Sequence, residues 1–393
     1  MTLILRLAFR NILGAGLRTW LNVFVLSAAF VMIIWVQGMV EGLNRTIMNA
    51  RIDSELGGGQ YWSQTYDPYD PLTYEDSHAP IPDALLGLIS DGDATAMLVT
   101  SGAMYPQGRI RPAVLLGVDP AQTIINLPSR ELNPHDDGTV PAMIGAEMAR
   151  ETGLAEGHYL TIRWRDASGT FDATEVRISH IVSFAVPGLD RGQVWVPLED
   201  LRRMLEVKGE ASLVVVRKGL EATPPPGNGW IWHDLDFLLA DLVEMVKMKS
   251  GSTYILYGLM LLMGLLAVFD TQVLAIWRRR REIGTLMALG MDRSRVIGLF
   301  TVEGALHGIL AFVVGAVYGI PLLGMTASRG IPVPEIMSEM GMPVPPRLYP
   351  DYGLSLVLGT MFIVLVSVTV VSMLPASNIA KLKPTDALRG KAK

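Results

Sequence analysis

The sequence contains no cysteine, which excludes disulfide bonds, thiolate nucleophiles and cysteine-ligated zinc sites. Its six histidines are scattered, and none stands in the HExxH pattern or another short spacing typical of metal sites. The G-x-x-x-x-G-K-[ST] phosphate loop and the G-x-S-x-G nucleophile motif are also missing. We therefore expect no metal site, no cofactor, no catalytic residue and no enzyme activity in this chain.

Charged residues are scarce in several long apolar stretches. Half of the residues are hydrophobic and the mean hydropathy is +0.34, which is more apolar than an ordinary soluble protein of 393 residues. No residue between Thr19 and Val40 is charged, and a helix of that length can cross a bilayer. The sequence predicts four transmembrane helices, at residues 19–41, 251–277, 294–325 and 352–375.

A cleaved signal peptide is the alternative interpretation of the first apolar stretch. The residues Ser27-Ala28-Ala29 resemble the small-residue cleavage site of such a peptide. The apolar run nevertheless continues to Val36, which makes it longer than the roughly 7–15 apolar residues of a signal peptide. We therefore predict that the first span is retained.

The net charge of −5 conceals two regions of opposite charge. Residues 42–250 carry 17 Lys and Arg against 29 Asp and Glu, whereas segments 1–18, 278–295 and 376–393 together carry 14 against 3. Basic segments next to membrane spans usually stay in the cytoplasm. The pattern predicts a multi-pass protein of the inner (cytoplasmic) membrane, with both termini in the cytoplasm and the acidic region in the periplasm or outside the cell.

Residues 42–250 have the alternating strand and helix patterns of a folded domain with stalks. The predicted fold class is therefore an α+β membrane protein, with four transmembrane helices and one large extracytoplasmic α+β domain between helices 1 and 2. Strands are predicted at 96–100, 113–118, 159–164, 176–184, 194–196 and 213–216, and helices at 82–89, 145–153 and 199–206. The remaining predicted segments are stalks at 38–52 and 235–246, an interfacial helix at 1–18, an external loop at 326–351 and a cytoplasmic tail at 376–393.

A short amphipathic helix is predicted between the second and third spans, within residues 278–293. Four consecutive arginines, Arg278 to Arg281, hold this end of the second span at the cytoplasmic surface. The next apolar residues follow at helical spacing and share one face: Ile283, Leu286, Met287 and Gly290. Such a helix has the shape to dock on another protein, and the alternative is a membrane-surface helix without a partner.

Two acidic residues, Asp270 and Glu303, lie within the predicted spans. A carboxylate at the centre of a membrane helix costs roughly 2.5–3.5 kcal/mol on insertion scales, so such residues commonly face the bundle interior and have a function. The alternative is that both reach the cytoplasmic surface, where Arg278–Arg281 or Arg295 could pair with them. We predict an intramembrane polar role for both residues and leave this alternative open.

Two pairs of glycines in the third span, Gly304/Gly308 and Gly315/Gly319, have the small-xxx-small spacing. Small residues at this spacing let membrane helices approach closely. The alternative is that glycine is simply frequent in membrane helices. The spacing indicates two close helix contacts along the third span.

Six motifs along nearly the whole chain carry a family resemblance. They are Leu7–Ile12 with Arg18-Thr19, Ile144–Ala149, Val194–Leu198, Arg281–Gly290, Glu303-Gly304 and Ile379–Arg389. Together with the four-span layout they resemble the FtsX-like permeases of ABC transporters, the group that includes MacB, LolC, LolE and FtsX. The most specific match is Arg281–Gly290, which resembles the coupling helix of that group. Residues Gly58-Gly59-Gln60 resemble the lipoprotein-releasing branch.

The resemblance implies a permease subunit that works with a separate ABC-type ATPase dimer, which would hold the ATP and Mg. It also implies a second permease subunit, identical or different, and movement of the extracytoplasmic domain driven by ATP hydrolysis. The two departures from the family pattern are Met287, where arginine is common, and Asp270, where MacB-type members usually have asparagine. The residues implied in ATPase contact are Arg281, Glu282, Ile283, Gly284, Leu286, Met287, Ala288, Leu289 and Gly290.

The cargo implied by this resemblance is a lipoprotein or a related exported molecule, and its acyl chains would enter between the first two spans. The alternatives are efflux of drugs or peptides, control of a cell-wall hydrolase, and a membrane receptor without an ATPase. Expected partners also include the lipid bilayer and a lipoprotein or periplasmic protein, but no nucleic acid. The hypothetical cargo-lining residues are Trp35, Met39, Leu43, Tyr257, Met260 and Met263, although such side chains are equally suited to face lipid.

Overall fold

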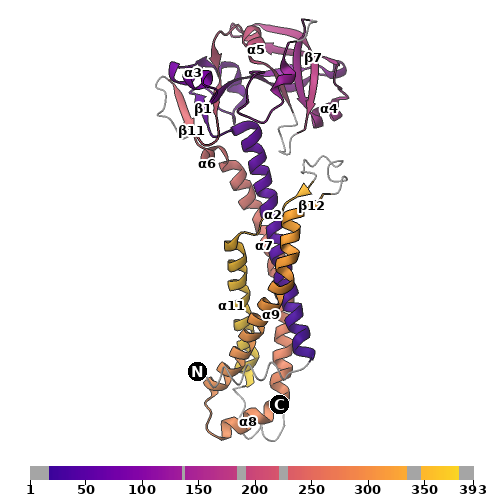
Figure 1. Ribbon diagram of the computed structural model, residues 1–393, viewed down its shortest axis with the longest axis vertical. Helices are drawn as coiled ribbons and strands as arrows, with labels where there is room; N and C mark the ends of the chain where they lie inside the picture. Colours follow the sequence, from indigo (N-terminus) through magenta and orange to yellow (C-terminus); the bar gives the residue numbers. More distant parts are fainter. Residues whose placement is uncertain (1–16, 135–137, 184–191, 221–228, 334–346, 380–393) are drawn as a thin grey trace. The chain divides into compact units, whose positions relative to one another are not determined.

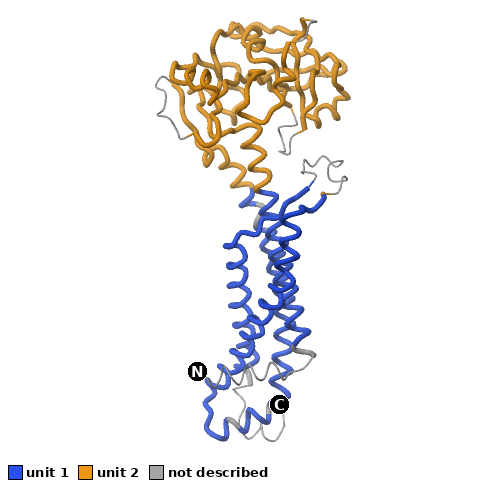
Figure 2. Tube along the Cα trace, viewed as in Figure 1, with its two compact units in different colours: residues 1–44, 246–332, 347–393 blue, residues 45–245, 333–346 orange. Residues whose placement is uncertain are grey.

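The computed structural model describes residues 17–134, 138–183, 192–220, 229–333 and 347–379 (Figure 1). Most of the predicted interfacial helix 1–18 and of the tail 376–393 lies outside the described residues, as does the middle of the loop 326–351. The chain divides into two compact units (Figure 2). We call residues 1–44, 246–332 and 347–393 the helical unit, and residues 45–245 and 333–346 the sheet unit.

Four helices in the described part of the chain are long and apolar enough to cross a membrane. They overlap the four predicted spans, and they are α2 (Leu17–Arg51), α7 (Ala240–Arg278), α9 (Arg293–Arg329) and α11 (Leu354–Ile379). The short helix α8 (Arg280–Ala288) lies between α7 and α9 in the chain, as predicted. A two-stranded pairing of β12 (Ile331–Pro332) with β13 (Arg347–Leu348) joins the segments between α9 and α11.

The predicted stalks are helical, with one interruption. Helix α2 continues to Arg51 and then into the π-helix η1 (Ile52–Leu56), which ends at Gly57, a residue with a positive φ of 59°. On the other side, the predicted stripe at 235–246 is divided into α6 (Leu235–Leu238) and the start of α7. Asp234 caps α6 by accepting a hydrogen bond from the backbone N–H of Phe237 at 2.9 Å.

The helical unit packs around the glycines of α9. An added Cβ at Gly304 would meet Ser372 of α11, and one at Gly308 would lie 3.4 Å from Leu365 of the same helix. Toward the other end of α9, Gly315 and Gly319 lie against α2, where Val31 is within 2.8 Å of a Cβ placed at Gly319. Both predicted glycine pairs therefore lie at close helix contacts, because a larger side chain would separate the backbones.

The sheet unit contains one nine-stranded sheet and a short two-stranded pairing. The order in the large sheet is β11-β1-β10-β3-β4-β8-β5-β7-β6, and the short pairing joins β2 (Ala79–Pro80) to β9 (Glu210–Ala211). The nine strands are β1 (Gln60–Ser63), β3 (Ala94–Met104), β4 (Arg111–Val118), β5 (Val140–Gly145), β6 (Tyr159–Arg165), β7 (Phe171–Val182), β8 (Gln193–Pro197), β10 (Leu213–Val216) and β11 (Trp230–His233). The helical elements are α3 (Asp83–Ser90), α4 (Ala146–Thr152), α5 (Leu198–Leu205), η2 (Pro71–Asp76), η3 (Pro106–Gly108) and η4 (Ser129–Leu132).

The long strand β3 closes part of this sheet on itself. Its first half pairs with β10, from Ala94 to Met97, whereas its last three residues pair with β6. Strands β3, β4, β8, β5, β7 and β6 therefore form a closed ring. At the crossover, a Cβ on Gly102 would lie 2.9 Å from the carbonyl oxygen of Arg163, so glycine permits this close approach.

Strands β3 and β4 are buried on both faces and separate two apolar cores. Leu98 and Leu115 point into one core, which α3, α4 and α5 help to form. Their chain neighbours Val99 and Leu116 belong to the other core, together with residues of η1, η4 and α6. All six predicted strands and all three predicted helices of this region are present, and the patterns did not predict β1, β2, β5, β9 or β11.

Candidate functional site

Helix α8 has one face packed against the helical unit. Ile283 is 3% exposed and lies in an apolar cluster with Ile276 of α7, Phe300 of α9 and Ala376 of α11. Gly284 is buried, and Met287 packs at the edge of the same cluster. Ile283 and Met287, two of the four residues of the predicted apolar face, are therefore covered by the chain's own helices.

The opposite side of α8 and its C-terminal end face solvent. Arg281, Glu282, Ala288, Leu289 and Gly290 are exposed, and Leu289 reaches 80% exposure. Gly290 has a φ of 97°, which favours glycine and turns the chain sharply after the helix. The side chain of Leu286 lies outside the described residues. The surface of α8 that is open to another protein is thus centred on Leu289.

Glu303 is buried in the helical unit and forms an ion pair at the base of α8. Its side chain is 7% exposed, and its Oε2 lies 3.4 Å from Nη1 of Arg279, the residue between α7 and α8. The Arg279 side chain is 29% exposed and also lies 3.9 Å from Glu282. The structure therefore pairs Glu303 with the arginine cluster, which is one of the two alternatives considered for this residue.

Asp270 has a different environment from Glu303. It is exposed on α7 and has no ion pair among the described residues. The arginine at the start of α9, Arg295, lies 3.9 Å from Asp292. The structure therefore places Asp270 on an exposed face of α7, where no ion pair joins it to a described arginine.

Four further polar side chains form a second group within the helices, and two of them are buried. Gln272 and His307 are 3% and 7% exposed, and Nδ1 of His307 donates a hydrogen bond to the carbonyl oxygen of Glu303 at 2.7 Å. Asn22 donates a hydrogen bond to Thr271, which ties α2 to α7. These four side chains line a void of about 10 Å³, close to the room that one water molecule needs.

The six predicted cargo-lining residues do not line the apolar cavity that is described within the helical unit. Trp35, Met39, Leu43, Tyr257 and Met260 are half-buried, and Met263 is 72% exposed. An apolar cavity of about 210 Å³ lies elsewhere in the helical unit, between α2, α9 and α11. It is lined by Leu26, Phe30, Gly308, Ile309, Ala311, Phe312, Met361, Val364 and Leu365.

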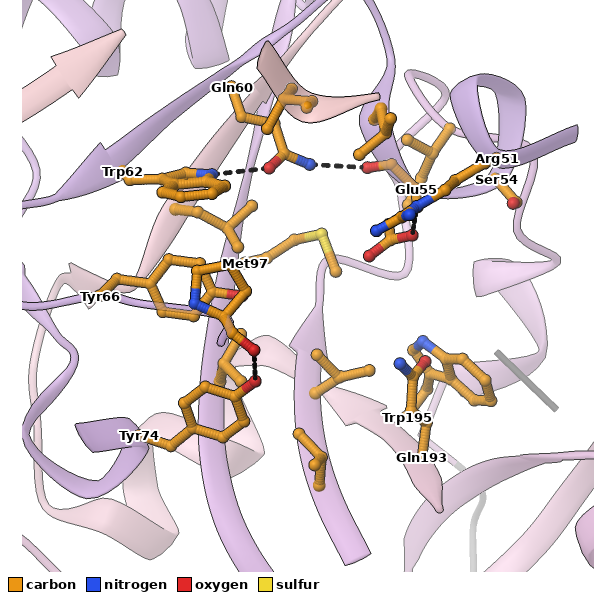
Figure 3. A pocket seen from close by; sticks show the side chains of 18 of the residues that line it. Arg51, Ser54, Glu55, Gln60, Trp62, Tyr66, Tyr74, Met97, Gln193 and Trp195 are labelled. Carbon is orange, nitrogen blue, oxygen red and sulfur yellow. Dashed lines mark hydrogen bonds and ion pairs between the residues drawn. The ribbon is translucent and has the colours of Figure 1, made fainter. Parts of the chain in front are cut away.

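The sheet unit contains a larger cavity, of about 240 Å³, which we call the aromatic cavity. Figure 3 shows Trp62, Tyr66 and Tyr74 on one side of it and Arg51 and Glu55 on another. The full lining is Arg51, Ser54, Glu55, Leu56, Gln60, Trp62, Tyr66, Pro68, Tyr69, Tyr74, Met97, Val99, Val114, Leu116, Ile125, Gln193, Trp195, Leu213 and Leu238.

Hydrogen bonds hold the polar wall of the aromatic cavity. Gln60 accepts a hydrogen bond from the indole N–H of Trp62 at 2.7 Å and donates one to the carbonyl oxygen of Glu55 at 3.0 Å. The Glu55 carboxylate in turn accepts a hydrogen bond from Nε of Arg51 at 3.1 Å (Figure 3). This chain of contacts fixes the ends of η1 and β1 relative to each other.

The tyrosines of the aromatic cavity have raised pKa values. Burial, together with Tyr74 and the nearby carboxylates, raises the pKa of Tyr66 above its ordinary value. Tyr69 is 60% exposed, so its desolvation is only partial, but this desolvation and a hydrogen bond with Asp241 raise the pKa of Tyr69 to about 12. These phenols therefore stay neutral and able to donate hydrogen bonds across the physiological pH range.

We expect Tyr69→Phe to remove a late-ionising phenol from the alkaline absorbance titration of the folded protein. A phenol whose pKa is higher in the folded state contributes stability that is complete below pH 10, its ordinary pKa, and that is lost as the pH rises toward 12. The difference titration between wild type and variant should therefore have its midpoint near pH 12. A midpoint near pH 10 would contradict the raised pKa.

Residues 254–384 match the FtsX-like permease C-terminal family. The chain contains an FtsX-like permease domain. Helices α8 and α9 lie entirely within this domain, and so do Asp270 and the Arg279–Glu303 ion pair. The most specific motif of the sequence, Arg281–Gly290, is therefore part of the FtsX-like permease domain.

Two relatives are similar to this chain over a region of 243 residues. They are the lipoprotein-releasing system transmembrane proteins LolC of Xylella fastidiosa strains Temecula1 and 9a5c, which are 24% and 23% identical to it. The matched region covers 55% of this chain and 57% of each relative, so the match spans little more than half of their length.

Two solved structures resemble parts of the chain. They are the extracellular domain of the noncanonic ABC-type transporter YknZ from Gram-positive bacteria and the periplasmic region of MacB from Actinobacillus actinomycetemcomitans. The YknZ domain is 14% identical to this chain. The match covers 42% of this chain and 84% of the YknZ domain, with a TM-score of 0.25. The MacB region is 10% identical to this chain. The match covers 51% of this chain and 98% of the MacB region, with a TM-score of 0.31. These scores are too low to support a conclusion about this chain.

Sequence reasoning missed two groups of residues that the structure brings together. Within the FtsX-like permease domain these are Gln272 and His307, which their position as polar residues inside apolar spans could have indicated. In the sheet unit they are the residues of the aromatic cavity. No local pattern joins Trp62 to Trp195, because strand pairing alone brings β1 and β8 into one unit.

Proposed function

We propose that this chain is the permease subunit of an ABC transporter, and that α8 docks on a separate ATPase dimer, which binds ATP and Mg. The observation that carries the proposal is the exposed end of α8 around Leu289, within the FtsX-like permease domain. The opposite face of the helix is already packed on its own unit. A docked ATPase would therefore bury Leu289 and leave the inner contacts intact.

The contacts of α8 suit it to transmit movement. Ile283 belongs to one apolar cluster with residues of α7, α9 and α11, and Arg279 pairs with Glu303 of α9. Close-packed contacts shift as rigid bodies rather than deform, so a displacement of α8 would move α7 and α9 with it. Helices α2 and α7 each contain residues of both units, which supports mechanical transmission from the helical unit to the sheet unit.

The charge distribution supports an orientation in the inner membrane with α8 in the cytoplasm. The arginines Arg278 to Arg281 lie where α7 ends and α8 begins, and the positive-inside bias favours the cytoplasmic side for them. The acidic sheet unit would then lie on the other side of the membrane. The similarity to LolC supports release of a lipoprotein, or of related amphipathic cargo, as the work of this permease, together with a second permease subunit.

Leu289→Glu is expected to abolish co-purification of the ATPase with the full-length protein. A carboxylate at the centre of the docking surface would be buried without a partner, which disfavours the complex strongly. The experiment purifies the tagged protein in mild detergent from its own cells and measures the ATPase subunit by quantitative mass spectrometry. We expect a loss of at least about tenfold relative to wild type.

The matched control is Leu72→Glu, because Leu72 is 89% exposed and lies on η2 of the sheet unit. This variant adds the same charge at another exposed leucine and is expected to retain the ATPase. If no ATPase co-purifies with wild type, or if Leu289→Glu retains as much as Leu72→Glu, the proposed docking surface is wrong.

A further inference from the structure

The aromatic cavity lies outside the FtsX-like permease domain, because all of its lining residues precede residue 254. Part of its lining is apolar and comes from two neighbouring strands, with Met97 and Val99 on β3 and Val114 and Leu116 on β4. Its volume of about 240 Å³ is below the roughly 300–1,000 Å³ of pockets for drug-sized ligands. The cavity therefore has room for one short apolar chain rather than for a long chain or a lipid with two chains.

The charged wall of the cavity carries one positive and one negative group. Nε of Arg51 lies 3.1 Å from Oε2 of Glu55, and the two side chains are 27% and 33% exposed. A ligand head with one charge would meet attraction from one group and repulsion from the other at similar distances. A zwitterionic head can satisfy both groups at once, with its anion toward Arg51 and its cation toward Glu55.

The aromatic wall favours the cationic part of such a head. The ring centroids of Trp62 and Tyr66 are 5.4 Å apart, with an angle of 89° between the ring planes. The rings of Tyr66 and Tyr74 are stacked, with their centroids 6.0 Å apart. Aromatic faces attract ammonium groups, most strongly where water is excluded. The Tyr66 hydroxyl and the Gln193 amide have no hydrogen-bond partner among the described residues, so both can bond to a ligand.

We propose that the aromatic cavity binds a zwitterionic single-chain amphiphile. Its hydrocarbon chain lies against the apolar residues of β3 and β4, and its phosphocholine-like or phosphoethanolamine-like head lies at Arg51, Glu55 and the aromatic rings. The proposal does not depend on ATPase docking, because every residue in it belongs to the sheet unit.

The test is photo-crosslinking of the full-length protein in nanodiscs with three probes. Each probe has the same 6-carbon chain with a terminal diazirine, short enough for the cavity, and the head is phosphocholine, carboxylate or trimethylammonium. Mapping by mass spectrometry separates labelling of β3 and β4 from labelling of the membrane helices. We expect the phosphocholine probe to label β3 and β4 about fivefold more than either singly charged probe, as expected for one added charge contact.

Two variants of the charged wall test the arrangement of the head. Arg51→Gln is expected to shift the preference toward the trimethylammonium probe, and Glu55→Gln toward the carboxylate probe. Loss of the fold would lower labelling by all three probes together, so a change of preference separates recognition from stability. Equal labelling of wild type by the three probes, labelling confined to other segments, or unchanged preferences in both variants would overturn the proposal.

Discussion

Arg279→Leu is expected to lower the free energy of unfolding of the full-length protein by about 3 kcal/mol, at the lower end of the cost of breaking a buried ion pair. The Glu303 carboxylate is 7% exposed and lies 3.4 Å from the Arg279 guanidinium, so the substitution leaves a buried charge without this cation. The lower end applies because Arg279 is itself 29% exposed. Reversible unfolding in bicelles, followed by steric trapping, measures the change.

The double variant Arg279→Leu/Glu303→Leu is the control for this prediction. Two apolar side chains of suitable size can replace a buried ion pair with little loss, so we expect most of the stability to return. The effects of the two substitutions would then be strongly non-additive. Additive effects, or a cost below about 0.5 kcal/mol for Arg279→Leu, would show that the pair does not hold α9 to the base of α8.

Gly304→Leu is expected to cost about 3 kcal/mol of stability, at the upper end of the usual cost of overpacking. A Cβ at Gly304 would meet the side chain of Ser372 on α11, and it would lie 3.4 Å from Nε2 of Gln272 on α7. Ser372 is fully buried and cannot turn toward solvent. The helices α9 and α11 must therefore separate, and thermal unfolding in detergent measures the loss.

Gly298→Leu is the matched control on the same helix. No atom lies within 4 Å of a Cβ placed at Gly298, so the added side chain meets open space. Leucine also has a higher helix propensity than glycine, by about 0.8 kcal/mol or slightly more. We expect no loss of stability for this variant, and an equal loss in both variants would contradict the role of Gly304 in close packing.

Most secondary structure of the sheet unit could be predicted because its strands are bounded by turn residues and rich in branched side chains. Strand β5 could not, since Val140–Gly145 is buried along nearly its whole length and contains a proline. A strand that is covered on both faces lacks the alternation of apolar and polar residues on which the prediction depends. The pairing of β3 with β6, which closes the ring of strands, could not be predicted from local patterns either, because it joins residues far apart in the chain.

The candidate site shows the same limit at the level of single residues. The spacing of Ile283 and Met287 predicted an amphipathic helix, but it could not show that this face packs on the chain's own helices. Likewise, the arginine cluster could be predicted to pair with Glu303, but only the helix packing selects Arg279. The position of Asp270 on the outside of α7 also depends on which face the neighbouring helices cover.

Local sequence patterns were enough to predict the four membrane-length helices, the basic segment between the second and third of them, and the mixed strand and helix content of the intervening region. These features depend on composition and on periods of a few residues, which are local properties of the chain. The packing of the helices and strands was needed to show which side of α8 is open, that Arg279 pairs with Glu303 and how the aromatic cavity is assembled. The physical reason is that burial and charge pairing depend on neighbours that are distant in the sequence.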